Sequence, residues 1–499
     1  MSEPTLIFER SQPGRPGTAV RAKSDCAHAK RRLPDALART ASLPLPEVSE
    51  LDLVRHYVEL SHRTFGVDVG FYPLGSCTMK YNPKATEAVS ARTGFAQVHP
   101  SQPEATVQGF LRLLYDLQQW LAEVTGMDSI SLQPAAGAQG EFSGMLIFRQ
   151  YFKQRGESAR DVMIVPDSAH GTNPASAVLA GFTMQEVDCA HQGGMMTTEL
   201  LEQVIAKHGA DHIAGIMLTN PSTLGIFEEH ILPVAARLHE IGAQLYYDGA
   251  NLNALVGLAR PGDMGFDLVH LNTHKTFSTP HGGGGPGSGP IGVKAHLADL
   301  LPYPIVVKNG GDAAGYSFAR PASSIGRIKL HHGQFLILVR TWAYMLLNGP
   351  EGLRRIAEFA ILNANYVQAR LKGAYEIPFG HKYCMHEFVA SADRQMAHGI
   401  RAMDIAKALL NEGYHAPTVY FPQIVHEALM IEPTETESPE TLDAFAETML
   451  RFARLAESDP AALKALPNLR VKHLDETYAA RNLNVRWQPP QQAAGSKMG

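Results

Sequence analysis

The sequence has few cysteines, and their spacing excludes small domains held together by disulfides or zinc. Cys26, Cys77, Cys189 and Cys384 are scattered through 499 residues, and no two of them form a CxxC pair. Disulfide frameworks and zinc knuckles both need cysteines at short, repeated spacings. We therefore expect reduced thiols, no metal centre and a cytoplasmic location.

The sequence also lacks a long apolar run, a strongly basic block and a secretory leader. No run of about 18 apolar residues is present, so we expect no membrane span. With a net charge of −5 and no Lys/Arg-rich block interleaved with aromatics, a nucleic-acid partner is not expected. Residues 1–8 lack the basic segment and apolar core of a signal peptide. The stretch to about residue 39 is rich in Arg, Lys, Pro and Ala, as transit peptides are, but we interpret it as an extended arm lying on a partner subunit.

Short apolar segments alternate with amphipathic segments from residue 129 onward. A helix is expected over 105–125, where apolar residues recur at three- and four-residue steps. Strands are expected at 129–133, 161–165, 182–187, 213–219, 243–247, 268–271 and 291–294, with helices between most of them. This alternation predicts an α/β fold whose mainly parallel sheet is covered on both faces.

The rest of the chain predicts a smaller α+β domain. Residues 301–327 are rich in Pro and Gly and are expected to be irregular, whereas 334–347 predicts an apolar helix that bridges into the second domain. Further helices are expected at 47–63, 351–373 and 439–457, and strands at 386–390 and 427–431. The expected organisation is an arm (1–50), a large domain (51–330), a small domain (331–480) and a tail (481–499).

Polar or Gly-rich turns follow five of the expected strands. They are residues 134–141, 168–174, 220–225, 248–251 and 272–275. Because the carboxyl ends of parallel strands meet at one edge of a sheet, these turns should lie together, where such sheets bind ligands.

Lys275 is the candidate that organises this edge. It ends a strand-end turn and precedes a loop, residues 282–287, that is almost entirely glycine. A lysine that forms a Schiff base with pyridoxal phosphate needs a strand to fix it and open backbone around a flat cofactor. The alternatives are that Lys275 is an ordinary surface lysine, or that Lys80, in the loop 70–83, is the cofactor amine.

Three further features supply what pyridoxal phosphate requires. Asp248 ends the strand before Lys275 and is expected to face the pyridine nitrogen, although Asp at this place can also be a helix N-cap. His170 follows another strand and could stack on the ring, or could be an ordinary satisfied polar residue. Gly137, Ala138 and Gln139 open a helix whose free amides could bind the phosphate, although a tight turn without a ligand would look the same.

The remaining candidates carry weaker signals. Asn220, His274 and Thr276 could reach the ring hydroxyl or the phosphate, and Ala250 shares the turn with Asp248 and is included among the cofactor-binding residues. The run 282–287 formally fits GxGxxG, but it precedes a strand instead of opening a helix, so we do not interpret it as a dinucleotide site.

Six stretches together resemble glycine decarboxylase, the P-protein of the glycine cleavage system. They are residues 72–82, 135–141, 168–176, 248–251, 274–287 and 432–438. The resemblance implies that Lys275 is the Schiff-base lysine, Asp248 the ring-nitrogen carboxylate and His170 the stacking histidine. It also implies the aspartate-aminotransferase-like fold (fold type I), with a seven-stranded, mainly parallel sheet.

The length matches subunit 2 of the two-subunit bacterial form, about half of the fused protein. The resemblance then implies a heterotetramer with P-protein subunit 1 and the activity of glycine dehydrogenase (aminomethyl-transferring). Glycine would lose CO2, and its aminomethyl group would pass to the lipoyl group of the H-protein. The alternatives are another pyridoxal-phosphate aminotransferase or lyase of the same fold, or a cofactor-free scaffold subunit.

Overall fold

The computed structural model describes residues 5–15, 17, 34–37, 39–41, 43, 45–282, 285–310, 315–469 and 474–485. The chain divides into two units, Val67–Arg470 and a smaller unit made of Met1–Gly66 and Val471–Gly499. Part of the expected N-terminal arm, including residues 18–33 with Cys26, and residues 486–499 of the expected tail lie outside the described residues.

The smaller unit contains one longer helix, α1 (Glu50–Ser61), within the predicted range 47–63. Ser49 caps it by accepting a hydrogen bond from Asp52 N at 3.1 Å. Ion pairs of 2.8 Å (Arg10–Glu59) and 3.0 Å (Arg15–Asp52) join residues 5–15 to this helix. A short helix, α15 (Glu476–Arg481), is the other described α-helix of the unit.

A seven-stranded sheet organises the larger unit, in the order β1-β7-β6-β5-β4-β2-β3. Its strands are β1 (Ser129–Ser131), β2 (Val162–Pro166), β3 (Thr183–Val187), β4 (Ile213–Thr219), β5 (Gln244–Gly249), β6 (Leu268–Leu271) and β7 (Ile291–Val293). Among these seven, β7 is the one strand that runs in the opposite direction to the other six. The predicted mainly parallel α/β fold is therefore confirmed.

Helices cover both faces of this sheet, as the nearly continuous apolar strands require. On β4, Ile216 and Leu218 face one apolar core while Met217 faces another. The first core is closed by α4 (Gln108–Thr125), α7 (Thr198–His208) and α8 (Ile231–Glu240). The second is closed by α5 (Gly137–Gln154) and α6 (Thr172–Leu179). The strands β2, β4, β5 and β6 are thus buried on both sides, which leaves the strand ends as the place where a ligand is expected.

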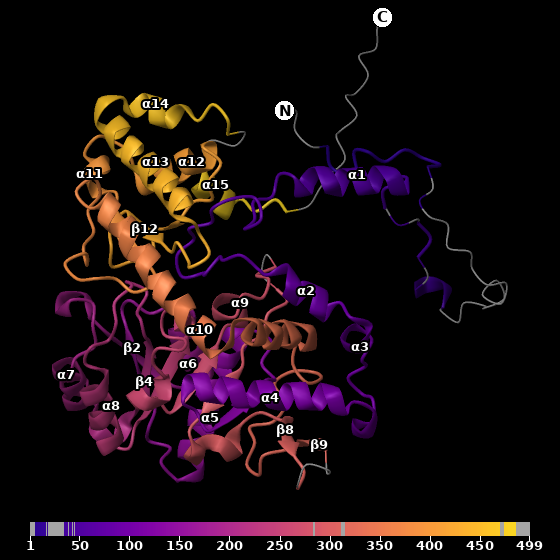
Figure 1. The fold of residues 1–499 in the computed structure, drawn as a ribbon, viewed down its shortest axis with the longest axis vertical. Helices are drawn as coiled ribbons and strands as arrows, with labels where there is room; N and C mark the ends of the chain where they lie inside the picture. Colours follow the sequence, from indigo (N-terminus) through magenta and orange to yellow (C-terminus); the bar gives the residue numbers. More distant parts are fainter. Residues whose placement is uncertain are drawn as a thin grey trace, which may run out of the picture. The chain divides into compact units, whose positions relative to one another are not determined.

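The second half of the larger unit has its own apolar core around a three-stranded sheet. The helix α10 (Phe335–Leu371) leads into it and is broken at Gly349, where φ is 62°, so the two predicted helices 334–347 and 351–373 lie on either side of that residue. The sheet consists of β10 (Phe388–Ser391), β12 (Ala428–Ile431) and β11 (Thr418–Val419). Figure 1 shows its helices gathered beside it: α11 (Asp393–Met396), α12 (Ala402–Asn411), α13 (Pro439–Ser458) and α14 (Pro460–Ala465).

One segment differs from the prediction. Residues 301–327 were expected to be irregular, but β8 (Ile305–Lys308) and β9 (Tyr316–Ala319) pair as an antiparallel hairpin. Gln118 of α4 fixes it: its side chain donates to Val306 O (3.1 Å) and accepts from Val306 N (2.9 Å). The stabilising contact comes from a distant helix, which the local sequence does not reveal.

Two short helices, α2 (Lys84–Ser90) and α3 (Thr93–Ala96), follow the loop 70–83. In the described part of the chain, no helix is both long and apolar enough to cross a membrane.

Candidate active site at the carboxyl edge of the sheet

The carboxyl ends of the parallel strands meet at a pocket, as the turn pattern predicted. The pocket holds about 500 Å³ of space not filled by atoms, part of it open to solvent. Its lining comes from six separate segments and consists of Ser76, Ala138, Glu141, His170, Thr172, Thr219, Thr223, Asp248, Ala250, His270, Asn272 and Lys275. The structure thus brings together five of the ten predicted site residues: Lys275, Asp248, His170, Ala138 and Ala250.

Lys275 lies in α9 (Thr273–Thr276), a single helical turn directly after β6. Its backbone N–H donates to Asn272 O at 3.0 Å, which fixes the turn at the end of the strand. The side chain is half-buried and lines the pocket. Among the described residues, its ammonium has no hydrogen-bond or ion-pair partner. An amine so placed remains available to a ligand.

Lys80, the alternative cofactor amine, has all three ammonium hydrogens engaged. Its buried Nζ donates to Asn253 Oδ1 (2.8 Å), Thr276 O (2.9 Å) and Glu435 Oε1 (2.8 Å). Desolvation lowers the pKa of Lys80, but the charge of Glu435 and the nearby Tyr344 outweigh it, so the pKa is raised overall. This geometry favours Lys275 as the free amine.

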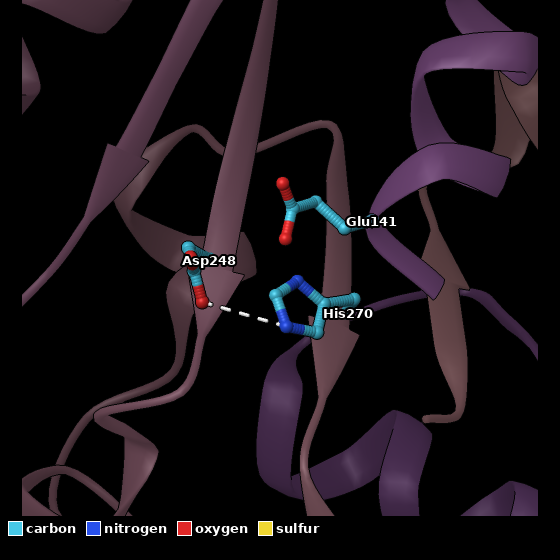
Figure 2. A group of neighbouring side chains, drawn as sticks. All are labelled: Glu141, Asp248 and His270. Carbon is cyan, nitrogen blue, oxygen red and sulfur yellow. Dashed lines mark ion pairs between the residues drawn. The ribbon is translucent and has the colours of Figure 1, made fainter. Parts of the chain in front are cut away.

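Asp248 ends β5 and lies opposite His270 of β6 in the register of the sheet. Asp248 Oδ1 accepts from Ala250 N (2.9 Å) and is 3.4 Å from His270 Nε2 (Figure 2). Tyr246 hydroxyl contacts His270 Nδ1, and Asn272 Nδ2 is 3.1 Å from His270 Nε2. Burial lowers the pKa of His270, so the imidazole is neutral. Its contacts with Tyr246 and Asn272 hold the ring beside the Asp248 carboxylate.

A second carboxyl group, that of Glu141, lies beside Asp248. It projects from α5 toward the same point, as Figure 2 shows, and is only 2% exposed. With its amide nitrogen facing the carboxylates, Asn173 donates to Asp248 Oδ2 (3.1 Å) and to Glu141 Oε1 (2.9 Å). Burial, and then the charge of Asp248, raise the pKa of Glu141 to about 8.

His170 lies at the mouth of the pocket on the segment between β2 and α6. Its Nδ1 is 2.9 Å from Thr172 Oγ1 and accepts from Thr172 N at 3.3 Å. The ring meets Phe421 edge-on, with centroids 6.1 Å apart. Desolvation lowers the pKa of His170, and the charge of Lys275 adds to this effect. A neutral, oriented imidazole is therefore available to lie against a flat ligand.

The first turn of α5 is packed tightly against the lysine segment. A Cβ on Gly137 would stand 1.9 Å from Asn272 Oδ1, so only glycine fits there. The side chain of Gln139 accepts from Ala135 N (2.6 Å) and donates to Ile328 O (2.8 Å), and its N–H donates to Ala136 O. Gln139 therefore shapes the turn, and the N–H groups of Gly137 and Ala138 are the ones left to face an anion.

Five predicted residues lie outside the pocket lining: Gly137 and Gln139, described above, and Asn220, Thr276 and His274. Asn220 is buried; its Oδ1 accepts from Glu228 N (3.1 Å) and its Nδ2 faces Met264 Sδ. Thr276 turns inward, and its buried hydroxyl has no hydrogen-bond partner among the described residues. His274 packs edge-on against His281, and burial lowers its pKa to about 3.

A second buried cluster joins the second half of the larger unit to the loop 70–83. Glu387 Oε2 accepts from Ser76 N (2.6 Å), and Glu432 accepts from both N and Oγ1 of Thr78 (2.8 and 2.6 Å). His386 Nε2 lies 4.0 and 3.8 Å from the two carboxylates, and neither of its ring nitrogens has a partner in the described residues. Burial raises the pKa of Glu432 to about 7 and lowers that of His386 to about 3.

Two groups in the described residues bring possible metal-ligand atoms within 4.8 Å of one another: Glu141, Asp248 and His270, and His386, Glu387 and Glu432. In the first group, both ring nitrogens of His270 already contact Tyr246 and Asn272. That arrangement favours a hydrogen-bonded network over a cation.

Sequence reasoning missed Glu141, Asn173 and His270 as site residues. Glu141 and Asn173 fall inside stretches that carry the resemblance, but neither the burial of a carboxyl nor the direction of an amide can be inferred from one sequence. His270 could have been predicted more easily. It lies five residues before Lys275 on the strand that neighbours Asp248, and strand alignment places the two opposite each other.

A lysine at the carboxyl edge of a seven-stranded, mainly parallel sheet, followed by a smaller α/β part, defines an aspartate-aminotransferase-like enzyme of fold type I. The crystal structure of glycine decarboxylase (P-protein) of the glycine cleavage system, in inhibitor-bound form, shares this fold with a TM-score of 0.69 and 22% identity, over 85% of this chain and 93% of that one. Alanine–glyoxylate aminotransferase from Nostoc shares it with a TM-score of 0.56 and 13% identity, over 77% and 95%.

Sequence comparison narrows the class to one family. Residues 356–461 match the family described as "Glycine dehydrogenase, C-terminal domain". The "Probable glycine dehydrogenase (decarboxylating) subunit 2" of Lysinibacillus sphaericus is 54% identical over 97% of this chain and 98% of that protein. The chain belongs to the glycine dehydrogenase (decarboxylating) subunit 2 family, which confirms the resemblance inferred from the sequence.

Proposed function

We propose that the chain is the lysine-bearing subunit of a glycine decarboxylase. It would bind pyridoxal phosphate, remove CO2 from glycine and pass the aminomethyl group to the lipoyl group of the H-protein. The observation that carries this proposal is the free amine of Lys275 in a pocket that also holds Asp248 and His170.

The residues present fit the cofactor. Lys275 would hold its aldehyde carbon, Asp248 its pyridine nitrogen and His170 one ring face, while the N–H groups of Gly137 and Ala138 would hold the phosphate. The buried hydroxyl of Thr219 lines the same pocket without a partner among the described residues, as expected of a group that completes its hydrogen bonding with a ligand. When bound, the cofactor supplies an electron sink for the electron pair left behind as CO2 departs.

The chain's own residues prepare this chemistry. The Asp248 carboxylate, held by Ala250 N–H and Asn173, favours a proton on a facing ring nitrogen. Lys275 would hold the aldehyde carbon of the cofactor, and its amine, once released, would remain in the pocket lining. Ser76 brings the loop 70–83 to the pocket wall, so we include this loop, with residues 434–438, in the entry route for a lipoyl arm.

The partners follow from the same proposal. We expect a heterotetramer with P-protein subunit 1, the lipoylated H-protein as acceptor and glycine as substrate. We also propose a cytoplasmic location, because Cys77, Cys189 and Cys384 are free thiols, as is usual in a reducing compartment. The pocket lining contains no arginine in the described residues, which disfavours an aminotransferase that must bind a second substrate carboxylate.

The test combines an activity assay with chemical trapping. The chain, mixed with subunit 1 and pyridoxal phosphate, should release CO2 from carboxyl-labelled glycine only when lipoylated H-protein is present. Borohydride reduction followed by peptide mapping should find the cofactor on Lys275. Lys275→Ala should abolish both signals, whereas Lys84→Ala, on the surface, should retain them.

Other outcomes would reject parts of the proposal. A reduced cofactor on Lys80 would overturn the site assignment. CO2 release without the H-protein would overturn the assigned acceptor. An absence of trapped cofactor in the assembled complex would support the scaffold alternative.

A further inference from the structure

A buried hydrogen bond from Lys80 fixes the backbone directly after Lys275. Lys80 Nζ donates to Thr276 O at 2.9 Å, and both residues are buried. The helix α9 is a single turn, so its last carbonyl groups have no partner within the helix and must find one elsewhere. A charged donor from a buried side chain is a strong partner for such a carbonyl.

Asn82 fixes the reversal of the chain that follows α9. Its Nδ2 donates to Ser278 O (3.0 Å) and to Ser278 Oγ (3.2 Å), while Ser278 Oγ donates to Tyr81 O (2.7 Å). Ser278 is buried and has a φ of 52°. A residue other than glycine keeps this left-handed conformation only where its surroundings hold it, and here the hydrogen bonds with residues 81 and 82 do so.

The same part of the loop 70–83 is held from its other side. Glu435 Oε1 accepts from Lys80 Nζ (2.8 Å), and Tyr81 N donates to Thr436 Oγ1 (3.2 Å). Residues 80–82 are therefore bonded both to residues 435–436 and to residues 276–278. They form a support whose own position is fixed.

Lys275 depends on this support because its side chain has no polar anchor of its own. It lines the pocket without a hydrogen-bond or ion-pair partner for its ammonium among the described residues. The position of the amine is therefore set by the backbone from which the side chain extends. Ser278 N donates to Lys275 O (3.2 Å) and Thr279 N to Thr273 O (3.3 Å), which closes residues 273–279 into one unit.

We propose that Lys80 and Asn82 are positioning residues that fix the segment 273–279 so that the amine of Lys275 lies in the pocket. Each acts through a backbone carbonyl, and neither lines the pocket. The functional meaning rests on the proposed function, in which this amine holds the aldehyde carbon of pyridoxal phosphate. Bond formation between two groups is fast only when they are held at the right distance and direction, so a loosened segment slows it.

The first measurement uses the full chain without cofactor. Asn82→Ala removes the donor to Ser278 O, and because Asn82 is half-buried the variant is expected to fold. Hydrogen exchange read by mass spectrometry should be about three- to tenfold faster in a peptide covering residues 273–279, as expected when one hydrogen bond is lost. The double variant Lys80→Met/Glu435→Leu, which lacks the donor to Thr276 O, should show the same acceleration.

Asn365→Ala is the matched control. Asn365 Nδ2 donates to Cys384 O (2.6 Å), and its Oδ1 accepts from Cys384 N (3.0 Å), so this variant loses side-chain-to-backbone bonds of the same kind between other segments. Exchange in residues 273–279 should stay at the wild-type rate, even if the stability of the variant falls.

The second measurement adds pyridoxal phosphate to the chain assembled with subunit 1. Borohydride is added after increasing times, and peptide mapping gives the rate at which the cofactor is captured on Lys275. Capture should be about tenfold slower in Asn82→Ala and unchanged in Asn365→Ala. The circular dichroism of the cofactor band, which depends on how the protein holds the ring, should change in Asn82→Ala alone of the two.

The proposal is overturned if exchange in residues 273–279 is unchanged in either of the two test variants, or if Asn365→Ala accelerates it equally. It is also overturned if capture keeps the wild-type rate despite faster exchange. Asn82→Ala keeps the test decisive should the double variant not fold. Failure of the proposed function would look different, because the wild type itself would then capture no cofactor on Lys275, and the exchange measurement would decide alone.

Discussion

Replacing Lys80 with methionine should destabilise the protein far more than removing an exposed lysine. The Lys80 side chain is fully buried, and Glu435, its ion-pair partner, is 8% exposed. Methionine keeps much of the apolar stem but leaves Glu435 as a buried charge without its partner. It also leaves Asn253 Oδ1 and Thr276 O without their donor.

The size of the effect follows from burial. Removing one partner of a buried ion pair costs about 3–5 kcal/mol, because the remaining charge stays desolvated. Lys84→Met is the matched control, since Lys84 and Asp68 form a pair of 2.5 Å whose side chains are 59% and 57% exposed. An exposed pair of this kind contributes about 0–1 kcal/mol.

Urea unfolding followed by tryptophan fluorescence measures the difference. Trp120 and Trp342 stack with ring centroids 6.1 Å apart, which places a probe between α4 and α10. The double variant Lys80→Met/Glu435→Leu should recover part of the lost free energy, because no unpaired charge remains. Equal destabilisation by Lys80→Met and Lys84→Met would refute the assignment of Lys80 as a structural ion pair.

Two other variants test packing and pH dependence. Gly137→Ala forces a Cβ to within 1.9 Å of Asn272 Oδ1 and should lower the free energy of unfolding in urea by about 1–3 kcal/mol. Gly109→Ala is the control, because open space surrounds Gly109, and it should not destabilise the protein. Equal effects of the two substitutions would contradict the close approach at Gly137. Glu228 has its pKa raised by burial from 4.5 to about 8, so the folded state binds the proton more tightly and stability falls as the pH rises through this window. The free energy of unfolding of Glu228→Gln should therefore fall less between pH 5 and pH 8 than that of the wild type, and parallel curves would show that Glu228 ionises normally.

The fold, and the edge of the sheet at which the site lies, could be predicted because the spacing of apolar residues along a helix or strand can be seen in a short stretch of sequence. The strand 213–219 coincides with β4, and the turns after five strands do lie together. Asp248 could be predicted because it lies at the end of an apolar strand, and Lys275 because it lies in the turn after the next one. The direction of the parallel strands then determines that both residues lie at the carboxyl edge of the sheet.

What could not be predicted depends on tertiary contacts. Lys80 and Lys275 are similar in sequence context, and only the three acceptors around Lys80 distinguish them. Gln139 looked like a phosphate ligand, but its amide is used within the turn.

The antiparallel strand β7 has a mechanical consequence. Because it returns alongside β6, the segment after Lys275 is brought back to the carboxyl edge, where Thr273 N donates to Ser288 O (3.2 Å) and Gly289 N donates to Pro134 O (3.1 Å). The same backbone thus joins the lysine turn to the turn that opens α5. In the proposed function, the residues that would hold the aldehyde and those that would hold the phosphate are therefore linked through hydrogen bonds of one backbone segment.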